Sequence, residues 1–163
     1  MIALKLVRLI ESHSDDLAKR LMARFDRRLT EADDLCRVPR PELEQRAYEV
    51  YKHLTDWLLY KTETDIEMTY TELGMRRAAQ RVPFGHFFWA IVTTREVLWE
   101  FLQDEGVADN PVDLLGGFEL LRMLERFFDK ALYYATLGYQ RGKAEIAEPV
   151  AEPATANMAR FVP

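Results

Sequence analysis

The 163-residue sequence has few of the residues that extracellular and strand-rich proteins need. Its one cysteine, Cys36, cannot form an internal disulfide, so a reducing cytoplasm is the expected location. Seven glycines and seven prolines are too few for the many turns of a strand-rich protein of this length. The length itself corresponds to about one domain, and we expect no room for a sensor fused to a complete output domain. These absences favour a single helical domain.

The sequence also lacks a surplus of positive charge and a long hydrophobic run. Its 22 lysines and arginines against 27 aspartates and glutamates leave a net charge of −5, which speaks against a nucleic-acid partner. The longest apolar stretch, Phe87 to Val92, has six residues, whereas a membrane-spanning helix needs about 20. The N-terminal run MIALKLVRLI carries Lys5 and Arg8 and is followed by no small-residue cleavage site, so it predicts an amphipathic helix rather than a signal peptide. We therefore expect no membrane insertion.

Hydrophobic residues recur at helical spacing in five segments. They cover about residues 2–29, 41–61, 64–82, 84–103 and 111–141. The run Thr64-Asp65-Ile66-Glu67 fits a capping box at the start of the third segment. The pattern predicts an all-α bundle of about five main helices over residues 1–142. Residues 143–163 contain three prolines and no helical stripe, which predicts a flexible C-terminal tail.

Motifs for catalysis or metal binding are absent from the sequence. It has no G-x-G-x-x-G, no Walker A loop and no H-E-x-x-H. The spacing of Glu49, His53 and Asp56 could hold a metal on one helix face, but a solvated polar face explains it equally well. We expect no enzyme activity, no metal and no cofactor.

Two features suggest contacts with a partner protein. Arg76, Arg77 and Arg81 form the sharpest local charge cluster, and a phosphate or a partner's carboxylate could bind there. A solvated helix face is the other reading of the same cluster. The apolar end of the tail, which includes Phe161, is a second candidate for docking, against the alternative of a frayed end.

The aromatic residues predict mainly core, with a small-ligand pocket as the alternative. The pocket would lie between the second, third and fourth segments, near Trp57, Met75, His86 and Trp89.

The last segment mixes large and small apolar residues, as a four-helix contact across a two-fold axis requires. The residues expected at this homodimer interface are Leu121, Leu124, Phe128, Ala131, Leu132 and Ala135.

Three stretches carry a family resemblance: LIESHSDDLAKRL, LGMRRAAQRVPFGHFFWAIVTTREVLWEFL and LERFFDKALYYATLGYQR. Together they resemble the N-terminal domain of RsbT co-antagonist proteins of the RsbRD type, from the bacterial stressosome, over about residues 5–142. The resemblance implies a globin-like helical domain that binds no haem, forms dimers and serves as a signal input or docking surface. Haem-binding globin sensors carry their proximal histidine about six residues before a proline, and here that neighbourhood of Pro83 holds Arg76, Arg77 and Ala78.

The sequence therefore predicts a non-enzymatic regulatory or adaptor protein, a dimeric input or docking domain without its own output domain. Two alternatives stay open. One is a sensor of a small ligand or haem, and the other is an accessory subunit of a larger redox or signalling complex.

Overall fold

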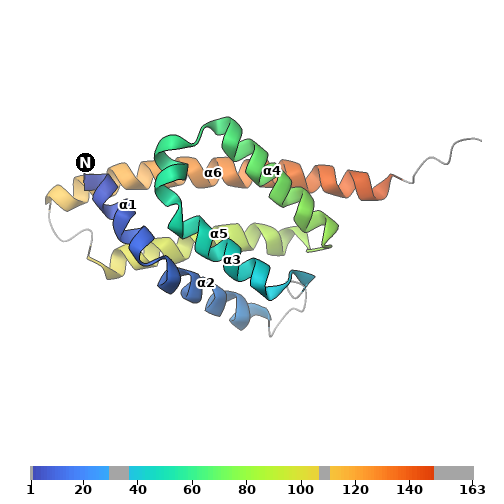
Figure 1. The fold of residues 1–163 in the computed structure, drawn as a ribbon, viewed down its shortest axis with the longest axis horizontal. Coiled ribbons are helices and arrows are strands. Elements are labelled where there is room, and N and C mark those ends of the chain that lie inside the picture. Colours follow the sequence, from blue (N-terminus) through green and yellow to red (C-terminus); the bar gives the residue numbers. More distant parts are fainter. Residues whose placement is uncertain (1, 30–36, 107–110, 149–163) are drawn as a thin grey trace, which may run out of the picture.

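A computed structural model describes residues 2–29, 37–106 and 111–148, and this part of the chain is helical throughout, without strands (Figure 1). In chain order the elements are α1 (Ile2–Ser12), α2 (Ser14–Leu29), α3 (Arg40–Lys52), a short π-helix η2 (Asp56–Tyr60), α4 (Glu63–Ala79), α5 (Phe84–Asp104) and α6 (Pro111–Ala147). The predicted all-α fold is confirmed, and its arrangement is consistent with a globin-like helical bundle.

The first predicted helix is two helices that meet at His13. The Ser12 hydroxyl donates to the Leu9 carbonyl at 2.8 Å, and the His13 Nδ1 lies 2.9 Å from the same oxygen. Side chains that bond to a nearby backbone carbonyl compete with the helical hydrogen-bond ladder. Ile10 and Leu17 on either side of the break are fully buried, so both helices contribute to one apolar surface.

The second predicted helix is also interrupted, because α3 ends at Lys52 and η2 follows. The capping box predicted at Thr64 was wrong by two residues. Thr62 is the N-cap of α4: its N–H donates to the Asp65 carboxylate at 2.7 Å, and the Asp65 N–H donates to the Thr62 hydroxyl at 3.3 Å. A threonine stands three residues before an acid twice here, as Thr62 with Asp65 and as Thr64 with Glu67. Thr62 has the extended backbone of an N-cap residue, so the earlier pair forms the capping box.

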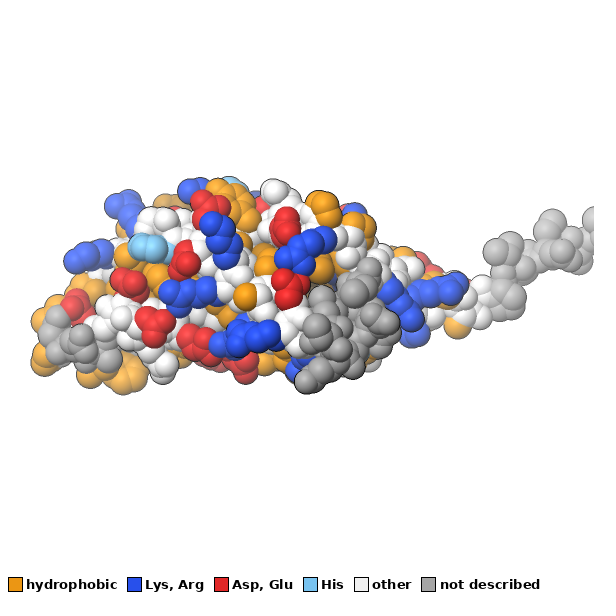
Figure 2. Space-filling model, turned by 90° about the horizontal axis from the view of Figure 1, so that it is seen from below, with side chains coloured by type: hydrophobic (Ala, Val, Ile, Leu, Met, Phe, Trp, Pro, Cys, Tyr) orange, Lys and Arg blue, Asp and Glu red, His pale blue; other side chains and the backbone are white. Residues whose placement is uncertain are grey.

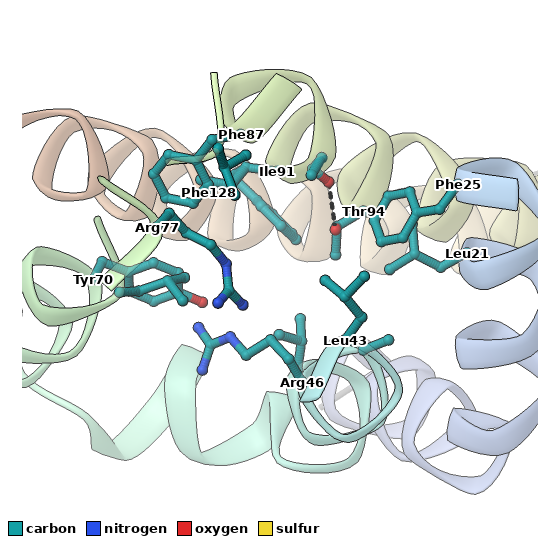
Figure 3. A pocket seen from close by; sticks show the side chains of 15 residues that line it. Leu21, Phe25, Leu43, Arg46, Tyr70, Arg77, Phe87, Ile91, Thr94 and Phe128 are labelled. Carbon is teal, nitrogen blue, oxygen red and sulfur yellow. Dashed lines mark hydrogen bonds between the residues drawn. The ribbon is translucent and has the colours of Figure 1, made fainter. Parts of the chain in front are cut away.

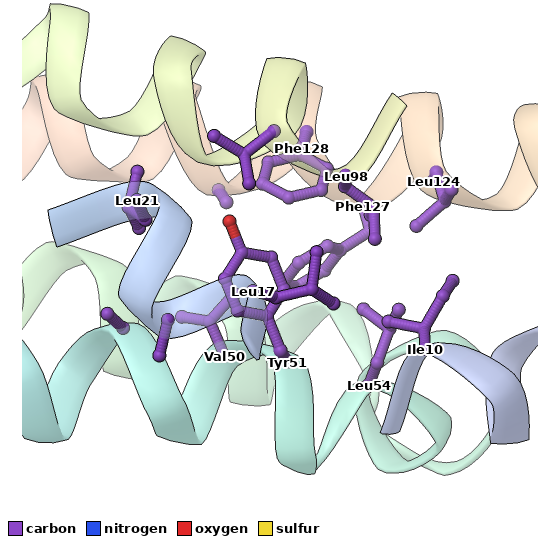
Figure 4. Close-up of a cluster of buried hydrophobic side chains, with 14 of the residues drawn as sticks. Ile10, Leu17, Leu21, Val50, Tyr51, Leu54, Leu98, Leu124, Phe127 and Phe128 are labelled. Carbon is purple, nitrogen blue, oxygen red and sulfur yellow. The ribbon is translucent and has the colours of Figure 1, made fainter. Parts of the chain in front are cut away.

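Helices α1–α3, α5 and α6 bury a common core around Tyr51 (Figure 4). Its largest fully buried side chains are Tyr51, Phe101, Ile10, Leu17, Leu21, Leu54, Leu98, Leu120 and Leu124. The Tyr51 hydroxyl donates to the Thr94 carbonyl at 2.9 Å, which satisfies the one polar atom of this side chain. Burial raises the pKa of Tyr51, so the phenol stays protonated.

The most extensive helix contact joins α4 to α6, and glycines make it possible. A Cβ on Gly74 would lie 2.1 Å from the Ala135 carbonyl oxygen, and one on Gly138 would lie 2.0 Å from the Thr71 carbonyl oxygen. The two backbones therefore touch directly, closer than helices with ordinary side chains at the contact. The Tyr139 hydroxyl also donates to the Val82 carbonyl at 2.6 Å, just after α4.

Helix α6 is longer than predicted and continues into the predicted tail. It ends at Ala147, and residues 143–148 are all exposed beyond the bundle (Figure 1). The predicted boundary after residue 142 thus falls inside a continuous helix. The rest of the predicted tail, residues 149–163, lies outside the described residues.

A left-handed residue ends α4. Arg81 has φ of 58°, its N–H donates to the Ala78 carbonyl at 2.9 Å, and the Val82 N–H donates to the Arg77 carbonyl at 3.1 Å. This pair of bonds is the Schellman motif, in which glycine is the usual left-handed residue. Val82 is fully buried, so the motif directs the chain back into the core before α5 begins.

The α4–α6 contact predicts that Gly138→Ala lowers the free energy of unfolding by about 3 kcal/mol, because the new methyl group meets rigid backbone. Gly85→Ala is the control: nothing lies within 4 Å of its Cβ position, so the added methyl group should cost no stability. Urea denaturation followed by circular dichroism measures both variants. Equal stability of the two would contradict the close backbone contact.

The left-handed backbone predicts that Arg81→Gly raises the free energy of unfolding by about 1 kcal/mol, since glycine adopts this φ without a Cβ clash. Arg81→Ala keeps the Cβ and serves as the control. Thermal melts should show a higher midpoint for the glycine variant only, and a gain shared by both would assign it to the loss of the arginine side chain.

Candidate functional site

A cavity of about 70 Å³ lies between α2, α3, α4, α5 and α6 (Figure 3). Its apolar lining consists of Leu21, Phe25, Leu43, Ala47, Val50, Leu73, Val82, Phe87, Ala90, Ile91 and Phe128. The polar lining is limited to Arg46 from α3, Tyr70 and Arg77 from α4, and Thr94 from α5. Thr94 donates its hydroxyl to the Ala90 carbonyl at 2.8 Å, so it is satisfied within its own helix.

Two arginines face each other at one side of the cavity (Figure 3). Arg77 is only 5% exposed. The Arg46 Cζ lies 5.0 Å from the centre of the Tyr70 ring, as in a cation–π contact. The Arg46 Nη2 atom is buried and has no hydrogen-bond partner among the described residues. This unsatisfied nitrogen stands out, because buried polar atoms are nearly always paired.

Glu42 of α3 binds the arginines that begin the last turn of α4. Arg76 donates to the Glu42 carboxylate with Nε at 2.8 Å and Nη2 at 2.9 Å, and Arg77 donates to it with Nη1. Gln80 accepts a second bond from Arg77 at 2.7 Å. The hydrogen bonds from Arg76 and then Arg77 outweigh partial burial and lower the pKa of the Glu42 carboxyl to about 2.

This corner of the molecule has an excess of positive charge. Burial lowers the pKa of Arg77, although a guanidinium remains protonated in proteins. Glu42 and, near Arg76, Glu72 supply two negative charges against Arg76, Arg77 and Arg46. No ion pair joins Arg46 to a carboxylate within the described ranges. The cavity therefore combines apolar walls with the Arg46 guanidinium, which lies over the Tyr70 ring and is paired with no carboxylate of the described residues.

None of the four residues predicted for a ligand pocket lines this cavity. Most of the lining comes from α3, α4 and α5, the segments between which the pocket is predicted, but these four side chains lie on other faces of the helices. The Trp57 ring packs against Phe127, with ring centres 5.7 Å apart, and Trp89 lies below the Arg28 guanidinium at 4.3 Å. Met75 meets α6 at Gly142, and His86 is half-buried away from the lining.

Most of the predicted dimer interface is core. Leu124, Phe128, Ala131 and Ala135 are buried within one chain, so another copy cannot reach them without unfolding. These four residues form a stripe on α6 that faces α4 and the core. The apolar pattern of a single helix does not show whether its partner is another helix of the same chain or a helix of a second copy. Leu121 and Leu132 are partly exposed.

The predicted docking arginines are mostly engaged inside the chain. Arg76 and Arg77 bind Glu42 as described, and only Arg81 is exposed without such a side-chain contact in the described structure. Phe161, the other predicted docking residue, lies outside the described residues. The charge cluster is evident in the sequence. Its contact with Glu42 is not, because Glu42 lies 34 residues before Arg76 in the chain.

The described ranges contain no group of three or more metal-ligating side chains. His53 Nδ1 and Asp56 lie 3.8 Å apart on the surface. No histidine, cysteine or methionine lines the cavity. Within the same ranges, none of the helices has the length and apolar character needed to cross a bilayer.

The Glu42 cluster predicts that Glu42→Gln lowers the free energy of unfolding by about 3 kcal/mol, because buried Arg77 loses its countercharge. Acid should act in the same way. The folded-state pKa of Glu42 is depressed, so its contribution is complete above the unfolded pKa near 4.5 and is lost as the pH falls towards 2.

Glu44→Gln is the control, since Glu44 pairs with Arg40 on the exposed surface and this pair contributes much less to stability than a buried one. Denaturation at pH 7 and at pH 3 measures both effects. Equal losses in the two variants would contradict the role of Glu42.

Comparison with known proteins gives a family assignment and nothing closer. No curated protein and no solved structure matches the chain. The sequence profile described as the RsbT co-antagonist protein rsbRD N-terminal domain matches residues 15–152, which is most of the chain and includes every lining residue of the cavity. The chain therefore belongs to the rsbRD N-terminal domain family of RsbT co-antagonist proteins, a family of stressosome-related regulatory domains.

Proposed function

We propose that the protein is a non-enzymatic signal-input or adaptor domain that works as a homodimer. The family supports a regulatory role. The observation that carries the dimer is an apolar stripe at the start of α6, which we call the α6 stripe. It consists of Val112, Leu114, Leu115 and Phe118.

The α6 stripe lies on the outer side of the first turns of α6, and the opposite side of these turns packs against the rest of the molecule. Gly116 lies against α1, where its Cβ would be 2.1 Å from Ile2 Cγ2, and Leu120 is in the core. Leu115 is 71% exposed and Phe118 is 59% exposed. In Figure 2, hydrophobic side chains gather at the end of the molecule where α6 begins, whereas acidic and basic side chains alternate over the rest of that face. Contiguous exposed apolar side chains of this kind are typical of interaction sites.

A second copy of the chain suits the α6 stripe better than a charged partner. Glu119 follows Phe118 directly, and Arg122 comes one helical turn after Phe118. Two copies of α6 crossing antiparallel near these residues would bring Glu119 of each copy towards Arg122 of the other. A two-fold axis makes every such contact twice, so a self-complementary stripe with opposite charges at its edge favours a homodimer.

The alternative of an accessory subunit docked through the arginines is weaker, since Arg76 and Arg77 are occupied by Glu42. The alternative of a ligand sensor has support from the cavity and does not conflict with a dimer.

The proposal predicts that Phe118→Asp converts a dimer into a folded monomer, because the exposed position tolerates the charge in the free chain but not in an apolar interface. Light scattering at micromolar concentration gives the mass, and circular dichroism checks the helix content. Met68→Asp is the control: Met68 is 67% exposed on α4, outside the stripe, and the variant should remain a dimer. A monomeric wild-type protein, or a dimeric Phe118→Asp variant, would refute the proposal.

A further inference from the structure

We propose that the cavity between the helices binds a small monocarboxylate with an apolar body, and that Arg46 binds the carboxylate. This inference is independent of the proposed dimer, since no lining residue belongs to the α6 stripe.

The walls set the chemical class of the ligand body. Eleven of the fifteen lining residues are apolar, and the cavity offers about 70 Å³. A water needs about 10–15 Å³ of such space and two to four polar partners. The space exceeds one water, and the walls supply few polar partners. A short alkyl chain or a single aromatic ring suits these walls better than solvent does.

The guanidinium sets the charge of the ligand head. Arg46 Nη2 is buried and has no acceptor in the described structure, and the neighbouring Arg77 adds a second positive charge that Glu42 and Gln80 already bind. The Arg46 side chain as a whole is partly exposed and lies over the Tyr70 ring, but a buried nitrogen without an acceptor is unfavourable. A carboxylate supplies two acceptor oxygens in the geometry of a guanidinium fork. It would complete the charge balance that the chain leaves open.

The position of Arg46 also sets the orientation. Arg46 is partly exposed, whereas Phe87 and Phe128 at the far wall are buried. The head group would therefore lie at the mouth, next to Tyr70 and Arg77, and the apolar body would point towards α5 and α6 (Figure 3). A phosphate ester fits less well, because a dianion needs more donors than the one unsatisfied nitrogen seen here.

Titration calorimetry with straight-chain carboxylates from butanoate to decanoate tests the proposal on the full chain. We expect one site per chain and an optimum chain length, since longer chains exceed the cavity. Octan-1-ol is the neutral partner of octanoate and should bind at least tenfold more weakly. No binding at any chain length, or equal affinity for acid and alcohol, would overturn the proposal.

Arg46→Met keeps an apolar stem and removes the guanidinium, so carboxylate affinity should fall at least tenfold and the preference for acid over alcohol should disappear. Lys52→Met is the matched control, because Lys52 is an exposed cation on the same helix outside the lining. Should Arg46→Met fail to fold, Arg46→Lys tests the same contact with the charge retained, and its affinity should fall because a lysine cannot form the two-bond fork. Unchanged affinity in the folded Arg46 variant, or an equal loss in Lys52→Met, would overturn the proposal.

Discussion

The direct backbone contact between α4 and α6 is the constraint on which the rest of the structure depends. Gly74 and Gly138 allow two helices that are distant in sequence to approach without side chains between them. The contact fixes α4 against the long helix, and this in turn sets where Tyr70 and Arg77 lie relative to α3 and α5. Without it, neither the Glu42 cluster nor the cavity would have its present geometry.

The Glu42 cluster and the cavity are two outcomes of the same charge distribution. Glu42 neutralises the pair Arg76 and Arg77 and holds α3 to the end of α4. Arg46 lies one helical turn after Glu42 on α3, and no described carboxylate binds its buried Nη2 nitrogen. The chain therefore pairs the buried Arg77 guanidinium with its own carboxylate, whereas the partly exposed Arg46 pairs with none of the described carboxylates.

Periodicity in the sequence was sufficient for the helices but not for their partners. The apolar spacing located the segments that became α4, α5 and most of α6, since each has a continuous stripe. The spacing does not show the break at His13, where the side chain bonds to the Leu9 carbonyl. It also does not show the end of α3, after which the π-helix η2 follows. In both places the apolar stripe continues across the interruption. The spacing also placed the dimer on Leu124 and Phe128, because a stripe shows which face is apolar but not which helix covers it. The spacing likewise does not indicate where space is left between helices: Trp57 and Trp89 do not line the cavity, whereas the smaller Ala47 and Ala90 do.

The two glycine contacts along α6 have a mechanical consequence. The helix crosses α1 at Gly116 and α4 at Gly138, and 22 residues of helix put these crossings about 33 Å apart. A rod held at two such points cannot pivot about either one without separating the other. Twisting about its own axis is blocked as well, because it would carry a neighbouring side chain of α6 into the place where Gly116 or Gly138 now leaves no room for a Cβ. The two crossings therefore hold the helix in one rotational setting along its whole length.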